Sequence, residues 1–269
     1  MNITTLNRRL VLALAASSAI YFAAPAMAVD TPPTANSAAA APDPTAIIVT
    51  ARRRNESLQT TPVAITAINT AALENKAAVN IADLQGAAPG LLITQQNSGA
   101  QAANLAIRGL TYADIEKSQT PTVGVVVDGI TIGTNTGQLQ DVFDIAQIEV
   151  LRGPQGTLFG ANTIGGVISI ERTKPTMKTG AKVEFSYGQW NTWAGKGIVN
   201  FGDGKSVGVK VWYSHNQTDG FYTNTNTNTR TGGSKDDSYG ASVLFKPEGS
   251  NFDAQFTLEN LVQLSLIHI

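Results

Sequence analysis

Cysteine is absent from this chain of 269 residues, and histidine occurs only twice, at His215 and His268. Without cysteine there is no disulfide framework, no thiol nucleophile and no thiolate metal site. A serine nucleophile elbow is missing too, and the run Gly204-Lys205-Ser206 has Val199 where a phosphate-binding loop requires glycine. We therefore predict that the protein is not an enzyme and that it needs no cofactor and no metal.

An excess of basic residues is also missing. Once the N-terminal Arg8 and Arg9 are set aside, 17 basic residues stand against 20 acidic ones. This near-balance provides no electrostatic footprint for DNA or RNA. We therefore predict no nucleic-acid partner.

No apolar run of helix-spanning length, ~17–25 residues, occurs after the N-terminal segment. In that segment Arg8 and Arg9 precede an uncharged, mostly apolar stretch, and Ala26-Met27-Ala28 then supplies small residues at the recognition positions of a cleavage site. Residues 1–28 are therefore predicted to be a cleaved secretory signal peptide. An uncleaved membrane anchor is the alternative.

Residues 29–46 are rich in alanine, proline and polar side chains, and they bury too little apolar surface to offset chain entropy. They predict a flexible tether. The following run, Ile-Ile-Val-Thr-Ala at 47–51, is prone to form a strand. An extended strand with no partner nearby is a candidate for pairing with the sheet edge of another protein. Its alternative role is the first strand of the following domain.

Residues 61–175 are predicted to form one α+β domain. Asn80 resembles a helix N-cap, with Asp83 at the third position of a short helix that ends near Leu84. Asp128-Gly129 is the signal for a two-residue hairpin turn in which both residues need positive φ. Strands are expected at residues 63–68, 91–94, 123–127, 130–132, 147–151 and 167–170.

From residue 176 to 263 the pattern changes to alternation of apolar and polar side chains, in five segments around residues 183–187, 193–201, 207–214, 239–246 and 252–259. Ile198 and Trp212 break the polar face. Residues 202–205 and 247–250 are tight turns, whereas 216–237 is expected to be a long polar loop. Short turns on one side and long loops on the other are typical of an outer-membrane barrel. A soluble β-sandwich alternates in the same way and is the alternative.

The most specific pattern lies in the middle of the chain. It consists of a run from Pro121 to Gly133 around Asp128-Gly129, then Ile-Glu-Val-Leu-Arg-Gly-Pro-Gln-Gly at 148–156, then Asn-Thr-Ile-Gly-Gly-Val-Ile-Ser-Ile at 162–170. At these residues the chain resembles the plug domain of TonB-dependent outer-membrane receptors. The resemblance implies a membrane all-β barrel with an N-terminal α+β plug domain. About five of roughly 22 antiparallel strands are present, so the barrel is incomplete.

The resemblance also assigns roles to residues. Receptors of this family carry a TonB box where this chain has Thr45, Ala46, Ile47, Ile48, Val49, Thr50 and Ala51, within the periplasmic segment 29–60. It implies that Arg108, Glu149 and Arg152 form ionic contacts between plug and barrel wall, although these charges read equally well as solvent-facing strand residues. Close approaches or positive φ are expected at a set of plug glycines, Gly109, Gly129, Gly153, Gly156, Gly165 and Gly166.

The function implied is active import of a scarce extracellular ligand, with a siderophore-like iron complex as the expected class. The implied partners are TonB with its inner-membrane complex, outer-membrane lipid and an extracellular small molecule. The implied location is the outer membrane of a Gram-negative cell. Two alternatives are a passive porin or adhesion barrel with a static lid, and a periplasmic enzyme with a soluble β-domain. Residues 264–269 are expected to be an adapter-derived tail; ordinary strand sequence is the alternative.

Overall fold

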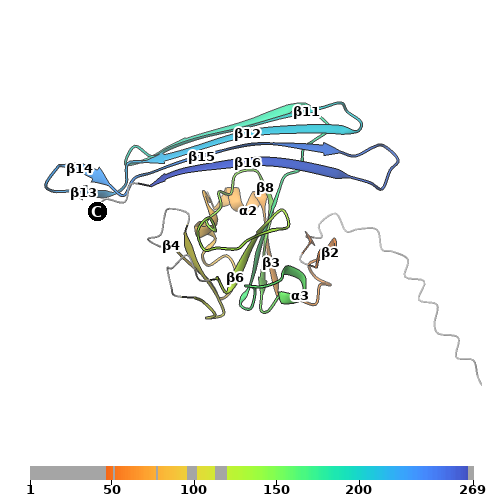
Figure 1. Cartoon of the computed structure of the whole chain (residues 1–269), viewed down its shortest axis with the longest axis horizontal. Helices are drawn as coiled ribbons and strands as arrows, with labels where there is room; N and C mark the ends of the chain where they lie inside the picture. Colours follow the sequence, from red (N-terminus) through yellow and green to blue (C-terminus); the bar gives the residue numbers. More distant parts are fainter. Residues whose placement is uncertain (1–46, 51, 77, 96–101, 113–119, 266–269) are drawn as a thin grey trace, which may run out of the picture. The chain divides into compact units, whose positions relative to one another are not determined.

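The protein is described by a computed structural model that places residues 47–265, apart from 51, 77, 96–101 and 113–119. The predicted signal peptide, the tether, and box residues Thr45, Ala46 and Ala51 lie outside the described residues. The elements fall into two main sheets and three short hairpins (Figure 1).

The first sheet has five strands in the order β3-β8-β9-β6-β7. Their bounds are Ile65–Asn69 for β3, Ile145–Arg152 for β8, Gly166–Arg172 for β9, Val123–Val127 for β6 and Ile130–Ile132 for β7. Only β6 and β9 run parallel; the other pairs are antiparallel. The turn between β6 and β7 is Asp128-Gly129 with φ of 48° and 85°, as the sequence predicted.

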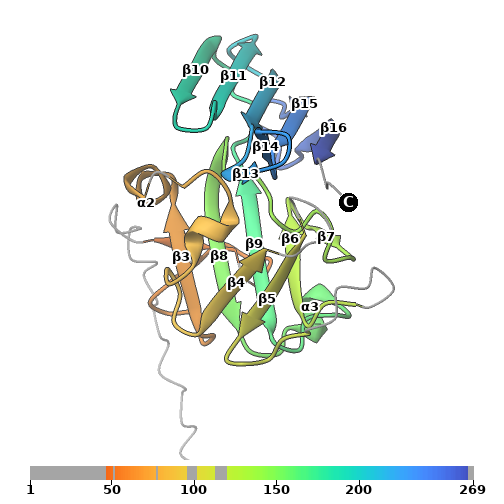
Figure 2. The same ribbon diagram turned by 90° about the vertical axis from the view of Figure 1, so that its left-hand side faces the viewer.

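One face of this sheet carries the main core. Alternate residues of the strands point into it, among them Ile148, Val150, Ile168 and Ile170. Helix α2 (Thr70–Asn75), the 3-10 helix η1 (Ile81–Leu84) and the hairpin of β4 (Leu91–Gln95) with β5 (Ala103–Ile107) contribute further buried residues to this core. In Figure 2 the β4–β5 hairpin crosses in front of the sheet.

The predicted cap of the short helix is confirmed. The Asn80 side chain accepts from the amide of Ala82 at 2.8 Å, and the Asp83 carboxylate accepts from the amide of Asn80 at 3.1 Å. This reciprocal capping box satisfies amides that have no partner within the helix.

The opposite face of the first sheet carries a smaller apolar cluster of Val126, Leu151 and Val167, against which Ile65 and Phe159 pack. Phe159 belongs to the single-turn helix α3 (Gly156–Phe159). Glu149 lies on the same face, two residues before Leu151 in β8, and it is fully buried. A buried carboxylate among apolar residues needs polar partners, and these come from the segment before β2.

The second sheet is an antiparallel meander in the order β10-β11-β12-β15-β16. Its strands are Gly180–Tyr187, Trp193–Gly202, Val207–Thr218, Ser234–Phe245 and Ala254–Ser265. Four of them have 10 to 12 residues, which is the length that a tilted strand needs to cross a bilayer, about 9–11 residues. The five predicted alternating segments therefore correspond to five strands of one sheet.

The loop predicted at 216–237 is too long. Strand β12 continues to Thr218 and β15 begins at Ser234, so the connection spans 219–233 and contains a hairpin of β13 (Tyr222–Asn224) and β14 (Thr229–Thr231). Polar residues extend the strands because they pair across the sheet: His215 Nδ1 lies 2.7 Å from the carboxylate of Asp237, its register partner. Leu264 and Ser265 likewise continue β16, whereas 266–269 lie outside the described residues.

The two faces of the second sheet differ in exposure. One face exposes apolar side chains, the most exposed being Val183 at 81%. The other carries Lys196, Ile198, Lys210, Trp212 and Ser242, all buried. Ile198 and Trp212, which broke the polar pattern in the sequence, are therefore on a face that is covered. In the part of the chain that the structure describes, no helix is long and apolar enough to cross a membrane.

Candidate functional site

The box strand, residues 47–50, forms a small hairpin with the chain that follows it. Strand β1 (Ile48–Val49) pairs antiparallel with β2 (Glu56–Ser57), and the amide of Leu58 donates to the carbonyl of Ile47 at 2.9 Å. The side chain of Val49 is 1% exposed, whereas that of Ile48 is 43% exposed. The expectation that this strand has no partner nearby is therefore wrong: its partner begins seven residues later.

Glu149 of β8 holds the end of the box strand. Its Oε1 accepts from the backbone amide of Thr50 at 2.6 Å and from the Thr50 hydroxyl at 3.2 Å. The Thr50 hydroxyl also makes a very short contact with Oε1 of Glu171 in β9. Gln147 completes the site, because its Nε2 donates to the carbonyl of Ile48 at 3.0 Å and to Glu149 Oε1 at 2.7 Å.

The electrostatics of Glu149 reflect this burial. The pKa of Glu149 is raised, mainly by burial and further by the charge of Glu171, while the hydrogen bonds from Thr50 and Gln147 oppose this rise. Its Oε2 is buried and has no hydrogen-bond partner. The site therefore anchors a strand through a carboxyl that is itself only partly satisfied.

Arg108, Glu149 and Arg152, the residues expected to contact the barrel wall, all lie in the plug. Arg108 follows β5 with φ of 54°, and a Cβ at Gly153 would lie 3.6 Å from its guanidinium, so its side chain passes over that glycine. Arg152 is half-buried, and its Nε is without a partner. Among the described residues none of the three forms an ion pair with strands β10–β16. Their contact with the wall stays a prediction.

Other residues make contacts between plug and wall. Lys196 of β11 lies 2.9 Å from the carboxylate of Asp141, which also accepts from Ser214 and Asn216, each at 3.1 Å. Lys210 of β12 pairs with Asp144 and also donates to the carbonyl of Thr173. The Lys210 side chain is 3% exposed. Two neighbouring strands thus each place a buried ammonium on the loop that leads into β8.

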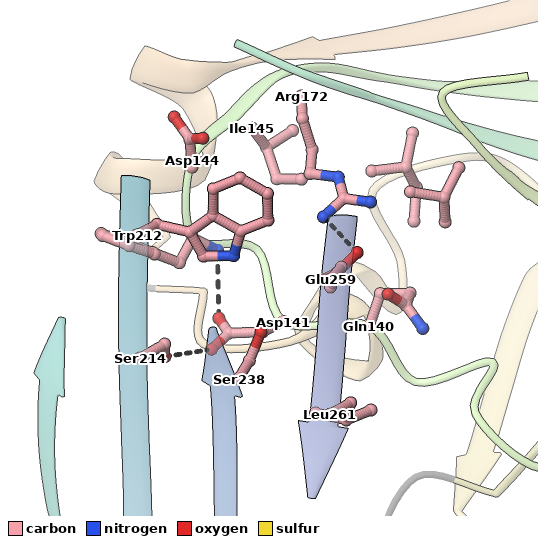
Figure 3. Close-up of a pocket in the computed structure, with 13 residues that line it drawn as sticks. Gln140, Asp141, Asp144, Ile145, Arg172, Trp212, Ser214, Ser238, Glu259 and Leu261 are labelled. Atoms are coloured by element: carbon pink, nitrogen blue, oxygen red, sulfur yellow. Dashed lines mark hydrogen bonds and ion pairs between the residues drawn. The ribbon is translucent and has the colours of Figure 1, made fainter. Parts of the chain in front are cut away.

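Arg172, the last residue of β9, makes a third contact with the wall. Its guanidinium lies 2.9 Å from Asp128 in the plug and 2.6 Å from Glu259 of β16, and it sits 5.8 Å from the ring centre of Trp212. Burial alone would lower the pKa of Arg172, but the charges and hydrogen bonds of Glu259 and Asp128 raise it. Figure 3 shows this arginine beside a cavity of about 50 Å³ that is lined by plug loop 140–145 and by strands β12, β15 and β16.

The predicted glycines differ in what the structure requires of them. At Gly166, φ is 150° and a Cβ would lie 2.3 Å from the carbonyl oxygen of Leu151. Gly165 allows a close approach of Val123, at 3.2 Å from such a Cβ, whereas the space at Gly156 is open. Positive φ occurs at the remaining three, Gly109, Gly129 and Gly153.

The sequence did not single out Thr50, Gln147 and Glu171 as partners of Glu149, nor Asp141 and Asp144 as partners of the wall lysines. A signal was present for the lysines, because an inward-facing ammonium in a wall that surrounds a plug needs a carboxylate opposite it. Within the described residues, no group of three or more histidine, aspartate or glutamate side chains could hold a metal ion.

Comparison with known proteins agrees with this architecture. The sequence model of the TonB-dependent Receptor Plug Domain matches residues 57–167. The vitamin B12 transporter BtuB of Vibrio vulnificus (strain YJ016) is 27% identical over 171 residues, which are 59% of this chain and 27% of the transporter. The pesticin receptor of Yersinia pestis is 32% identical over 127 residues, 46% of this chain and 18% of that receptor.

Two solved structures show the same fold. The ferric yersiniabactin uptake receptor FyuA from Yersinia pestis superposes with a TM-score of 0.68 at 22% identity, over 74% of this chain and 31% of FyuA. The pyoverdine receptor FpvA from Pseudomonas aeruginosa PAO1 gives 0.65 at 19% identity, over 80% of this chain and 30% of FpvA. Residues 57–167 belong to the plug-domain family of TonB-dependent receptors, and the fold continues into a sheet like part of the barrel wall of the solved receptors. The chain matches about a fifth to a third of the length of these relatives.

Proposed function

We propose that this chain is the energy-coupling part of an outer-membrane receptor that imports a scarce extracellular ligand with force delivered by TonB. The observation that carries the proposal is the docked box strand. A short strand joined to the plug by one buried hairpin residue and a few hydrogen bonds can leave without unfolding the sheet beneath it. Once released, residues 45–51 would add a strand to TonB.

The wall contacts support the same function. The plug meets the wall through three ion pairs, to Asp141, Asp144 and Glu259, and such polar contacts can re-form with other polar partners when the plug moves. The exposed apolar face of β10–β16 would meet outer-membrane lipid. Export to that membrane would follow cleavage of the signal peptide at residues 1–28.

The expected ligand is a siderophore-like iron complex. Two of the solved relatives are named for ferric yersiniabactin and for pyoverdine, although another relative is named for vitamin B12. Uptake of a panel of radiolabelled iron–siderophore complexes and of cobalamin by cells that produce the complete receptor would identify the class.

The alternative of a passive barrel with a static lid has one observation in its favour. Because β1 pairs with β2 and Val49 is buried, the box strand has a structural role within the plug itself. A partner inside the chain therefore removes one argument against the passive barrel.

The test is a Val49→Pro substitution in the complete receptor. Proline removes the amide that a strand donates to its neighbour. We expect ligand binding to outer membranes to persist and energy-dependent uptake to be abolished, with Ile47→Val, a conservative change at a half-exposed position, as the control. Equal uptake by Val49→Pro and the parent would support the passive barrel.

A further inference from the structure

The contact between Thr50 and the plug brings two carboxyl groups to one hydroxyl. Thr50 Oγ1 lies 3.2 Å from Oε1 of Glu149 and closer still to Oε1 of Glu171. A hydroxyl carries one proton and can donate to only one of them. With both carboxyls ionised, one of the two contacts would set a lone pair against a negative charge.

Neighbouring side chains do not neutralise this pair. The register partners of Glu149 are Ala67 in β3 and Ser169 in β9, neither of which is charged. Among the described residues, no basic side chain forms an ion pair with Glu149 or Glu171.

The nearby arginines are engaged elsewhere. Arg52 in the chain after the box strand lies 3.5 Å from Glu56, and Arg53 lies over the ring of Phe159. Arg172, next to Glu171 in sequence, is directed to Asp128 and Glu259. Two like charges at one buried site are relieved when one of them takes up a proton, as in other carboxyl pairs.

We propose that Glu149 and Glu171 form a proton-dependent latch for the box strand: the strand is docked while the pair carries one proton and is released more readily when both carboxyls are ionised. The proton comes from solvent, which reaches the half-buried Glu171. This inference rests on the proposed function only for the purpose of release, which is to let the box strand pair with TonB. The latch itself concerns only whether the strand is docked on the plug.

The direction of the pH effect follows from the released state. There, water reaches Glu149 and its pKa returns toward the ordinary value, whereas in the docked state the pKa is raised by burial and by Glu171. Because the pKa of Glu149 is higher in the docked state, protonation of this carboxyl at low pH stabilises the docked state. This stabilisation is lost as the pH rises through the pKa of the docked state. Acid therefore keeps the strand docked and neutral pH loosens it.

The absence of cysteine from the sequence makes a clean measurement possible. Val49→Cys introduces one thiol at the buried position of the strand, and Ile47→Cys introduces one at a half-exposed position as the reference. The rate of maleimide labelling at Val49→Cys, divided by the rate at Ile47→Cys at the same pH, reports how often the strand is released. The complete receptor in outer membranes is used, without ligand and without TonB.

We expect this ratio to rise severalfold between pH 5 and pH 8, because the pKa of Glu149 is higher in the docked state than in the released state. Glu149→Gln and Glu171→Gln, each of which keeps the shape and removes one charge, should give a low ratio at both pH values. Glu248→Gln in the exposed turn before β16 should behave as the parent.

A ratio that does not change with pH in the parent would overturn the latch, and so would a pH dependence that survives in both glutamine variants. Because labelling needs neither uptake nor TonB, these outcomes leave the proposed function standing. Unchanged uptake by Val49→Pro would instead remove the function and leave the latch.

Discussion

The backbone amide of Thr50 lies 2.6 Å from the carboxylate of Glu149, 99 positions later in the chain. The donor belongs to the segment expected to meet TonB, and the acceptor is fully buried in the central strand pair of the plug. The box strand and the core of the plug are therefore joined by a short hydrogen bond between residues that are far apart in the sequence.

Loss of the Thr50 hydroxyl should loosen the box strand. Thr50→Val keeps the shape but removes the hydroxyl that lies between the two carboxyls, and a hydrogen bond to a charged group contributes about 1.5–3 kcal/mol. We expect amide hydrogen exchange of residues 47–50 to accelerate by about tenfold or more. Thr50→Ser, which keeps the hydroxyl, is the matched control. Equal exchange in the two variants would show that the hydroxyl does not hold the strand.

The buried ammonium of Lys210, although it belongs to a strand of the wall, should contribute to the stability of the plug. Lys210→Met leaves Asp144 buried without its cation, which typically costs about 3–5 kcal/mol. We expect a lower plug unfolding temperature by calorimetry, and no change for Lys205→Met in the exposed turn between β11 and β12. Adding Asp144→Leu to Lys210→Met should recover part of the loss. A variant as stable as the parent would mean that solvent reaches Asp144.

Gly166 should tolerate no side chain. Gly166→Ala places a Cβ 2.3 Å from the carbonyl oxygen of Leu151, at a backbone conformation that L-residues avoid. Strain of this kind costs about 1–3 kcal/mol, and the clash adds to it. Gly156→Ala is the control, since the space there is open. We expect chemical denaturation to show a loss of stability for the first variant alone; equal stabilities would contradict the packing at β9.

Local and periodic features of the fold could be predicted from the sequence. The turn at Asp128-Gly129, the Asn80 cap and the five alternating segments each depend on neighbouring residues or on a period of two. The loop at 216–237 was drawn too long because polar residues at strand ends look like loop until their partners across the sheet are known, as with His215 and Asp237.

The candidate site was harder to predict, because it joins segments that are distant in sequence. The contact between Thr50 and Glu149 gives no periodic signal, and neither does the contact between Lys210 and Asp144, 66 positions apart. The resemblance named Glu149 as important, but its partner in the structure is the box strand. In the same way, Ile198 and Trp212 are exceptions to the alternating pattern in the sequence, and the structure explains them because they lie on the covered face of the second sheet.

Cross-linking between the box strand and TonB tests the central claim most directly. Ile48→Cys, at an exposed position of the strand, would be combined in the complete receptor with a cysteine in TonB and with either Thr50→Ser or Thr50→Val. We predict a disulfide with TonB in both, with a clearly higher yield for Thr50→Val in the absence of ligand. No cross-link in either variant would contradict the coupling role of the strand, and equal yields would contradict its retention through the Thr50 hydroxyl.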